Sequence, residues 1–185
     1  MHNLKIIAVV GLTGSGKTEA VLRFIKHGFE RTGFNEPTYE EVDKLGLERN
    51  ETNERVTREK MRKEFGMGVM AERSLPLVNS AIAKSKSVVV ESLYSWSEYK
   101  IMKKSFGDSF GVLAVYAPPK MRYARLAIRP VRPLTEELAM SRDYAEIENV
   151  EKGGPIAMAD WTIQNIGTLN VFVAEVDSLI GKVTS

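Results

Sequence analysis

The apolar positions of this chain fall into two kinds of pattern. Residues 4–10, 87–91 and 112–116 form short apolar runs without alternation, which are typical of strands buried on both faces of a sheet. Between and after them lie longer stretches with apolar residues three and four positions apart, which predict helices. The clearest of these helices follows a cap at Thr168, and its apolar stripe is Leu169, Phe172, Val173, Val176, Leu179 and Ile180.

The remaining elements complete an alternation of strands and helices. Two further short strands are predicted over residues 29–34 and 161–164. Helices are predicted over residues 19–26, 38–45, 51–65, 69–84, 97–105, 120–129 and 136–149. We expect Pro76 to interrupt the fourth helix and residues 153–155, Gly-Gly-Pro, to break the chain. The alternation indicates an α/β fold with a parallel sheet covered on both faces, with the ligand beyond the carboxyl ends of the strands.

Composition narrows the class of protein. The chain has 185 residues, which suits one domain with a substantial core. Its 26 basic and 24 acidic side chains give a net charge of +2, so charge does not favour binding to nucleic acid or a membrane surface. There are no cysteines and only two histidines, which argues against disulfides and a zinc site. Without a long apolar run or a signal peptide, we expect a cytoplasmic protein.

The strongest chemical signal follows the first strand. Residues 11–18 read Gly-Leu-Thr-Gly-Ser-Gly-Lys-Thr and match the spacing G-x-x-x-x-G-K-[S/T] of a phosphate-binding loop. Glycines let backbone N–H groups face a phosphate, Lys17 can reach the β- and γ-phosphates, and the Thr18 hydroxyl can hold Mg²⁺. The predicted nucleotide contacts of this loop are Gly11, Thr13, Gly14, Ser15, Gly16, Lys17 and Thr18.

A second cationic feature lies in the charged helix predicted over residues 51–65. Arg55, Arg58 and Arg62 are three and four residues apart and therefore share one face. This stripe could face the anionic part of an acceptor substrate, or it could be an ordinary solvated flank. The sequence leaves both interpretations open.

Several segments together resemble a known family, the small P-loop nucleotide kinases of the adenylate kinase and dephospho-CoA kinase type. The likeness is closest to uncharacterised, archaeal-type adenylate-kinase-like proteins. It depends on the phosphate-binding loop and on Ala117-Pro118-Pro119 leading to Arg125 and Arg129. It depends further on residues 141–147, Ser-Arg-Asp-Tyr-Ala-Glu-Ile, and on residues 159–165, Ala-Asp-Trp-Thr-Ile-Gln-Asn, before Gly167.

The resemblance implies a single P-loop NTPase domain, a three-layer α/β/α sandwich with a five-stranded parallel sheet. ATP and Mg²⁺ would be its cofactors, residues 35–85 a helical acceptor-binding insertion, and residues 125–142 a lid. Arg125 would lie on the adenine face, and Asn165 and Gly167 would lie beside the base. Arg129 and Arg142 would reach the phosphates. From the residues alone, Arg125 and Arg129 could instead be surface arginines, and Arg142 could pair with Glu146.

The sequence departs from this family on the acceptor side. Many relatives carry Asp-Gly and an arginine after the third strand, where this chain has Glu91 and Tyr94. Glu91 could still orient a water bound to Mg²⁺. Glu36 and Tyr39 replace an aspartate and an arginine after the second strand. Glu36 is placed like the acid that takes a hydroxyl proton in dephospho-CoA kinases, or it merely stabilises a helix start.

Two functions from different classes follow. The first is an ATP-dependent kinase for a small nucleotide or nucleotide-like acceptor, with catalytic roles for Lys17, Glu36, Glu91, Arg129 and Arg142. The acceptor contacts would be Glu36, Tyr39, Arg55, Arg58, Arg62 and Tyr94, and the metal contacts Thr18 and Glu91. The alternative is a nucleotide-dependent switch or regulatory ATPase without a phosphoryl acceptor. The sequence leaves open ATP or GTP as donor, and a monomer or homodimer.

Overall fold

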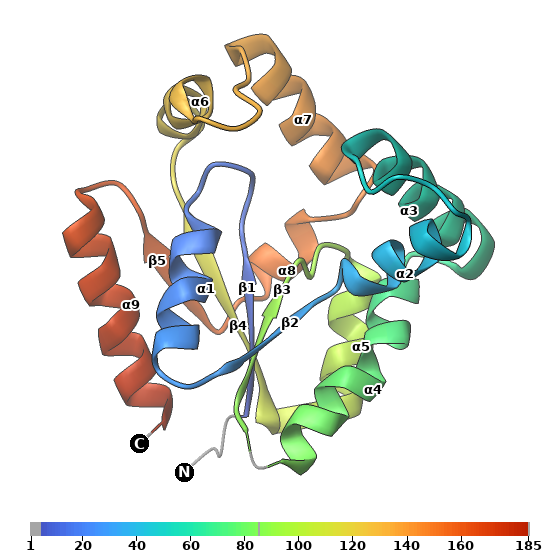
Figure 1. The fold of residues 1–185 in the computed structure, drawn as a ribbon. Helices are drawn as coiled ribbons and strands as arrows, with labels where there is room; N and C mark the ends of the chain where they lie inside the picture. The colour runs from blue at the N-terminus through green and yellow to red at the C-terminus, as the bar shows by residue number, and fades with distance from the viewer. Residues whose placement is uncertain (1–4, 85, 185) are drawn as a thin grey trace.

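The computed structural model describes residues 5–84 and 86–184, which form one sheet flanked by helices (Figure 1). The strands are β1 (Ile6–Val10), β2 (Glu30–Gly33), β3 (Val88–Glu91), β4 (Phe110–Tyr116) and β5 (Trp161–Gln164). All are parallel and lie in the order β2-β3-β1-β4-β5. The predicted five-stranded parallel sheet is confirmed, and the predicted strand start at Leu4 lies outside the described residues.

The central strands are buried on both faces because helices cover both sides. Ile6 of β1 is in register with Val88 of β3 and with Phe110 of β4. Every residue of β1 is at most 1% exposed. This burial explains why the central strands show apolar runs without alternation.

The helical layers give the three-layer sandwich. Helices α1 (Lys17–Lys26) and α9 (Leu169–Thr184) cover one face of the sheet, and α4 (Val69–Ala83) and α5 (Trp96–Phe106) cover the other (Figure 1). The first core contains Val9, Phe24, Phe172 and Val176. The second contains Ala8, Val78, Val90 and Met102. One continuous sheet thus separates two hydrophobic cores.

Four further helices lie beyond the carboxyl ends of the strands. Helices α2 (Glu36–Lys44) and α3 (Glu51–Phe65) lie on one side, and α6 (Pro119–Ile128) and α7 (Glu136–Glu148) on the other (Figure 1). A short 3-10 helix, η1 (Gly107–Ser109), leads into β4. Among the residues that the structure describes, no helix is both long and apolar enough to cross a membrane.

Two predictions about proline were wrong. Helix α4 runs through Pro76 without interruption, because buried residues on both sides of it, including Met70 and Val78, pack into one core. Residues 153–157 form the short helix α8 (Gly153–Ala157). Pro155 lies in its first turn, where the missing N–H would have no partner in the helix anyway.

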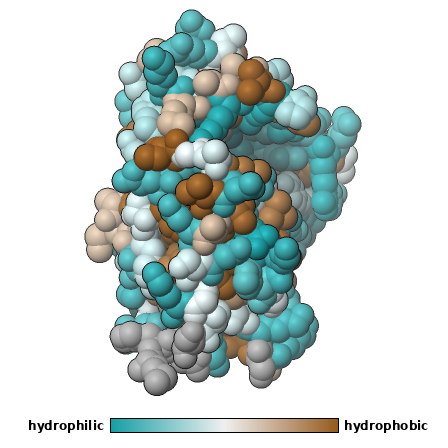
Figure 2. Space-filling view, turned by 90° about the vertical axis from the view of Figure 1, so that its left-hand side faces the viewer, coloured by the Kyte–Doolittle hydropathy of each residue, from teal (hydrophilic) through white to brown (hydrophobic). Residues whose placement is uncertain are grey.

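The face around α9 is a mixed surface. Figure 2 shows apolar side chains interspersed with hydrophilic ones on this side of the molecule. Exposed apolar residues of the elements here include Leu22, Leu169 and Val171. Such scattered exposure is normal for a protein surface in water.

Candidate active site

The phosphate-binding loop connects β1 to α1 and depends on its glycines. Gly11 and Gly16 have φ angles of 142° and 106°, which side chains rarely adopt. A Cβ on Gly11 would lie 2.4 Å from the carbonyl oxygen of Val115, and one on Gly16 would lie 2.4 Å from Nδ2 of Asn165. Neighbouring elements therefore approach the loop so closely that only glycine fits. The result is a cradle that can accept a triphosphate.

Lys17 is the first residue of α1, and its ammonium lies over the loop. Nζ donates a hydrogen bond of 3.1 Å to the carbonyl oxygen of Leu12. Burial lowers the pKa of Lys17 to about 7, and the positive charges of Lys152, Arg142 and Arg122 add to this effect, while Glu146 opposes it. Thr18 follows on the exposed side of the helix start. A phosphate group here would restore the charge of Lys17.

Asn165, which directly follows β5, contacts the phosphate-binding loop through its side chain. Its Nδ2 donates a hydrogen bond of 2.9 Å to the carbonyl oxygen of Ser15, and its own carbonyl oxygen accepts one of 2.9 Å from Nη2 of Arg125. The second terminal nitrogen of Arg125 is buried without a hydrogen-bond partner among the described residues. The structure thus brings Arg125 and Asn165 together beside the loop, whereas Gly167 is exposed.

Arg122 of α6 connects the loop to α7, and sequence reasoning missed it. Its guanidinium donates hydrogen bonds to the carbonyl oxygens of Thr13 (2.9 Å) and Ala117 (3.1 Å). It also forms two hydrogen bonds, of 2.8 and 2.6 Å, with the carboxylate of Asp143 on α7. Arg122 is only 2% exposed, so this ion pair is part of the interior.

Glu146, one turn further along α7, reaches the same threonine. Its carboxylate accepts hydrogen bonds from the Thr13 hydroxyl (2.6 Å), from Nζ of Lys152 (2.8 Å) and from Nε of Arg142 (3.2 Å). Burial alone would raise the pKa of Glu146, but Lys152, Thr13 and Lys17 together lower it to about 2. The carboxylate is therefore ionised near neutral pH. The pairing of Arg142 with Glu146, which the sequence left as an alternative, is present.

A cleft of about 780 Å³ opens beside the loop, between α2 and α3 on one side and α7 on the other. Its volume lies within the range of small-molecule sites. Six residues predicted for the site line it: Tyr39, Arg55, Arg58, Arg62, Tyr94 and Arg142. Residues that sequence reasoning did not place there include Glu51, Glu54, Arg132, Glu146 and Lys152.

Arg62 is the most buried arginine of the charged stripe. Its side chain is 10% exposed, and its Nη2 lies 3.5 Å from Oε1 of Glu98, which is fully buried. Its Nε has no hydrogen-bond partner among the described residues, although it is buried at the wall of the cleft. The favourable interactions of Glu98 with Arg62 do not fully offset its burial, so the pKa of Glu98 is raised. Arg62 thus has an unused donor beside the cleft.

Four predicted catalytic residues lie outside this cleft lining: Lys17, described above, and Glu36, Glu91 and Arg129. Glu36 is exposed in the first turn of α2. The carboxylate of Glu91 accepts a hydrogen bond of 2.7 Å from Nε of Arg31 on the neighbouring strand. Arg129 lies in the connection after α6 and donates to the carbonyl oxygen of Arg132. Burial and the charges of Arg142 and Arg132 lower the pKa of Arg129.

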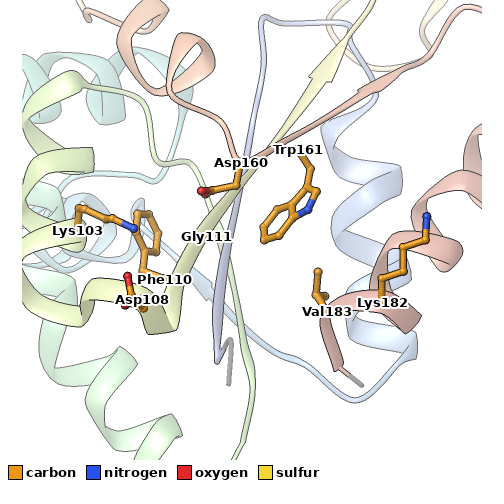
Figure 3. Close-up of a pocket in the computed structure, with 8 residues that line it drawn as sticks. All are labelled: Lys103, Asp108, Phe110, Gly111, Asp160, Trp161, Lys182 and Val183. Carbon is orange, nitrogen blue, oxygen red and sulfur yellow. The ribbon is translucent and has the colours of Figure 1, made fainter. Parts of the chain in front are cut away.

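A second pocket, of about 400 Å³, lies at the amino ends of β4 and β5 (Figure 3). Asp160, Lys103 and Phe110 lie on one side of β4, and Trp161 and Lys182 lie on the other. The Asp160 carboxylate accepts a hydrogen bond of 2.8 Å from the N–H of Val112, which extends the contact between β4 and β5 to the residue before β5. This pocket is at the end of the sheet away from the phosphate-binding loop.

Comparison with solved structures shows the fold. A dephospho-CoA kinase from Campylobacter jejuni superimposes with a TM-score of 0.58 and 16% identity, over 98% of each chain. A gluconokinase from Sinorhizobium meliloti gives 0.58 and 15%, over 96% of this chain and 92% of the other. A shikimate kinase from Acinetobacter baumannii gives 0.55 and 17%, over 97% and 94%. The fold is that of the small P-loop kinases, while the adenylate kinase likeness stays a prediction.

Comparison with curated proteins shows the family. A UPF0200 protein from Thermococcus kodakarensis is 32% identical over 183 residues, which cover 97% of this chain and 98% of the other. A UPF0200 protein from Sulfurisphaera tokodaii is 30% identical over 99% of both chains. The chain belongs to the UPF0200 protein family. No family model matches it, so this membership rests on relatives aligned over their whole length.

Proposed function

We propose that this protein is an ATP-dependent kinase that transfers the γ-phosphoryl group to a nucleotide or nucleotide-like acceptor. One observation carries the proposal: the cationic cleft of about 780 Å³ shares Arg142, Glu146 and Lys152 with the surroundings of the phosphate-binding loop. A donor in the loop and an acceptor in the cleft would therefore meet at these residues. The dephospho-CoA kinase and shikimate kinase with the same fold support phosphoryl transfer.

The loop residues would bind and orient the triphosphate. Backbone N–H groups of Gly14 and Gly16 cradle its oxygens, and Lys17 moves from the Leu12 carbonyl oxygen to the β- and γ-phosphates. Arg129 and Arg142 would approach the transferred group from the lid side and stabilise its negative charge. The exposed Thr18 hydroxyl and the Glu91 carboxylate would hold Mg²⁺, which would neutralise part of the phosphate charge.

The other wall of the cleft would hold the acceptor. Arg55, Arg58 and Arg62 offer guanidinium groups for a phosphate or another anion, and Tyr39 and Tyr94 offer rings for a base. This combination suits a nucleoside monophosphate or a larger nucleotide such as dephospho-CoA. Glu36 keeps its proposed role as proton acceptor only if α2 turns it toward the cleft.

An ADP-release assay over nucleoside monophosphates, nucleosides and dephospho-CoA tests the proposal. We expect one acceptor to raise the rate well above that of ATP alone. Lys17→Met should abolish this turnover, because it removes the cation over the loop. Lys26→Met, at the exposed end of the same helix, should not change it. If no acceptor accelerates ADP release, the kinase proposal is wrong.

The second candidate is a nucleotide-dependent switch or regulatory ATPase. It is favoured by the placement of the two candidate acids, since Glu36 is exposed outside the cleft lining and Glu91 is paired with Arg31. This alternative predicts slow ATP hydrolysis that no small acceptor changes. It also predicts a protein partner that binds either the ATP state or the ADP state, and pull-downs with each nucleotide would detect that preference.

A further inference from the structure

The carboxylate of Glu146 lies in surroundings that suit an anion of higher charge. Besides the three hydrogen bonds above, it is 3.4 Å from the backbone N–H of Thr13, within the phosphate-binding loop. Its donors are therefore a loop N–H, a hydroxyl, an ammonium and a guanidinium, with Lys17 close enough to lower its pKa further. These are the groups that proteins use to bind phosphate oxygens.

Lys152 is the least expected member of this group. Its side chain is 3% exposed, and its ammonium lies 4.3 Å from the ring centre of Tyr94. A tight turn after α7 places it there: Glu151 has a φ of 57°, and the N–H of Lys152 donates to the carbonyl oxygen of Glu146. A buried lysine held by a left-handed turn costs stability, which indicates a use for its charge.

The hydrogen bonds of Lys152 leave capacity for a ligand. An ammonium has three N–H donors, and among the described residues that of Lys152 has one acceptor, Glu146. Arg122 differs, because four hydrogen bonds, to Thr13, Ala117 and Asp143, use all but one of the five N–H donors of its guanidinium. Arg122 is thus a structural cation, whereas Lys152 has donors to spare.

We propose that Lys152 is a phosphate-binding residue, and that Glu146 is an internal anion that occupies its site until a phosphoryl group replaces it. The proposal deepens the nucleotide-binding part of the proposed function. The incoming group would take the Thr13, Arg142 and Lys152 donors, and the displaced carboxylate would turn toward the cleft that it already lines. Until then, the Glu146 carboxylate would neutralise part of the charge of Arg142 and Lys152.

Binding of sodium tripolyphosphate, measured by calorimetry at pH 7 without metal, tests this directly. Glu146→Gln keeps the shape of the side chain and removes the competing charge, so the affinity should rise about tenfold. Glu148→Gln makes the same change on the same helix at an exposed position and should leave the affinity within about twofold. If Glu146→Gln does not fold, Glu146→Asp withdraws the carboxylate from Thr13 and should also tighten binding.

The role of Lys152 is best measured without Glu146, because Lys152→Met alone would leave Glu146 unpaired. In the Glu146→Gln background, Lys152→Met should lower the tripolyphosphate affinity about tenfold, and Lys152→Arg should retain most of it. Unchanged or weaker binding of tripolyphosphate by both Glu146 variants would overturn the proposal. An unchanged affinity when Lys152→Met is added to Glu146→Gln would overturn it as well. Tripolyphosphate needs no acceptor, so failure of the kinase assay alone leaves this result intact.

Discussion

At the scale of single residues, the most informative group is the ammonium of Lys17. In the free protein its pKa is lowered to about 7, first by burial and then by Lys152, Arg142 and Arg122. Phosphate oxygens would oppose both causes and raise the pKa again. Nucleotide binding should therefore be linked to protonation of this side chain.

This linkage predicts proton uptake on ATP binding. At pH 8 the free Lys17 is mostly neutral and the bound one charged, so binding should take up as much as about 0.9 proton; at pH 6 both forms are charged and uptake should approach zero. Calorimetry in buffers of different ionisation enthalpy measures this number. Lys17→Arg stays charged at both pH values and should show no uptake. Uptake that persists in this variant would assign the titrating group to Lys152.

The arginine stripe gives a second prediction at this scale. Arg58 lines the cleft without being part of the Arg62–Glu98 contact. Arg58→Met should raise KM for the acceptor about tenfold or more, because under the proposed function it removes a cation that would contact the acceptor, and it should change KM for ATP little. Lys60→Met, at an exposed position on the same helix, is the matched control. Equal effects of the two variants on KM for the acceptor would indicate that the arginine stripe is an ordinary solvated helix face.

At the scale of elements, α6 and α7 are joined by one buried ion pair. Side chains of Arg122 and Asp143 are 2% and 6% exposed, and Arg122 also holds the carbonyl oxygen of Thr13. A buried cation without its partner is costly. The position of α7 over the loop thus depends on a contact between residues 21 positions apart in the chain.

Asp143→Asn should therefore destabilise the protein by about 3–5 kcal/mol, because Arg122 stays charged in the interior. The free energy of urea unfolding measures this change. Asp43→Asn provides the matched control, since Asp43 pairs with Arg49 while both side chains are about half exposed. Exposed pairs contribute roughly 0–1 kcal/mol. A loss of similar size in both variants would contradict a structural role for the buried pair.

The elements themselves could largely be predicted from the sequence, because their signals are local. The glycines of the loop and the apolar periods lie within short windows, and every predicted strand is found. The role of Arg122 could not be predicted, because its partner Thr13 is 109 residues away and nothing local distinguishes it from Arg125. A readable signal was missed at Ser95, which forms a capping box with Glu98 at the start of α5.

At the scale of the whole molecule, an exposed ion pair links the two sides of the cleft. Arg132, in the connection between α6 and α7, contacts the carboxylate of Glu51 at the start of α3. Both side chains are more than half exposed. Such a pair is weak and is screened by salt, so it can hold the connection between α6 and α7 against α3 without fixing it there.

Hydrogen exchange of residues 129–135 should therefore rise with salt. Between about 0.05 and 0.5 M NaCl, screening weakens the contact and the segment should exchange faster. In Glu51→Gln, exchange should already be fast and should respond little to salt. The unfolding free energy of this variant should change by less than about 1 kcal/mol. Salt-independent exchange in the unaltered protein would show that other contacts hold the segment.

The wall formed by Arg142, Glu146 and Lys152 belongs both to the cleft and to the surroundings of the loop. Two ligands that rearrange the same three side chains are expected to bind cooperatively. Thermodynamic reciprocity then applies. If ATP changes the affinity for the acceptor by some factor, the acceptor must change the affinity for ATP by the same factor. Through these three side chains, the occupancy of each site would thus depend on whether the other site is filled.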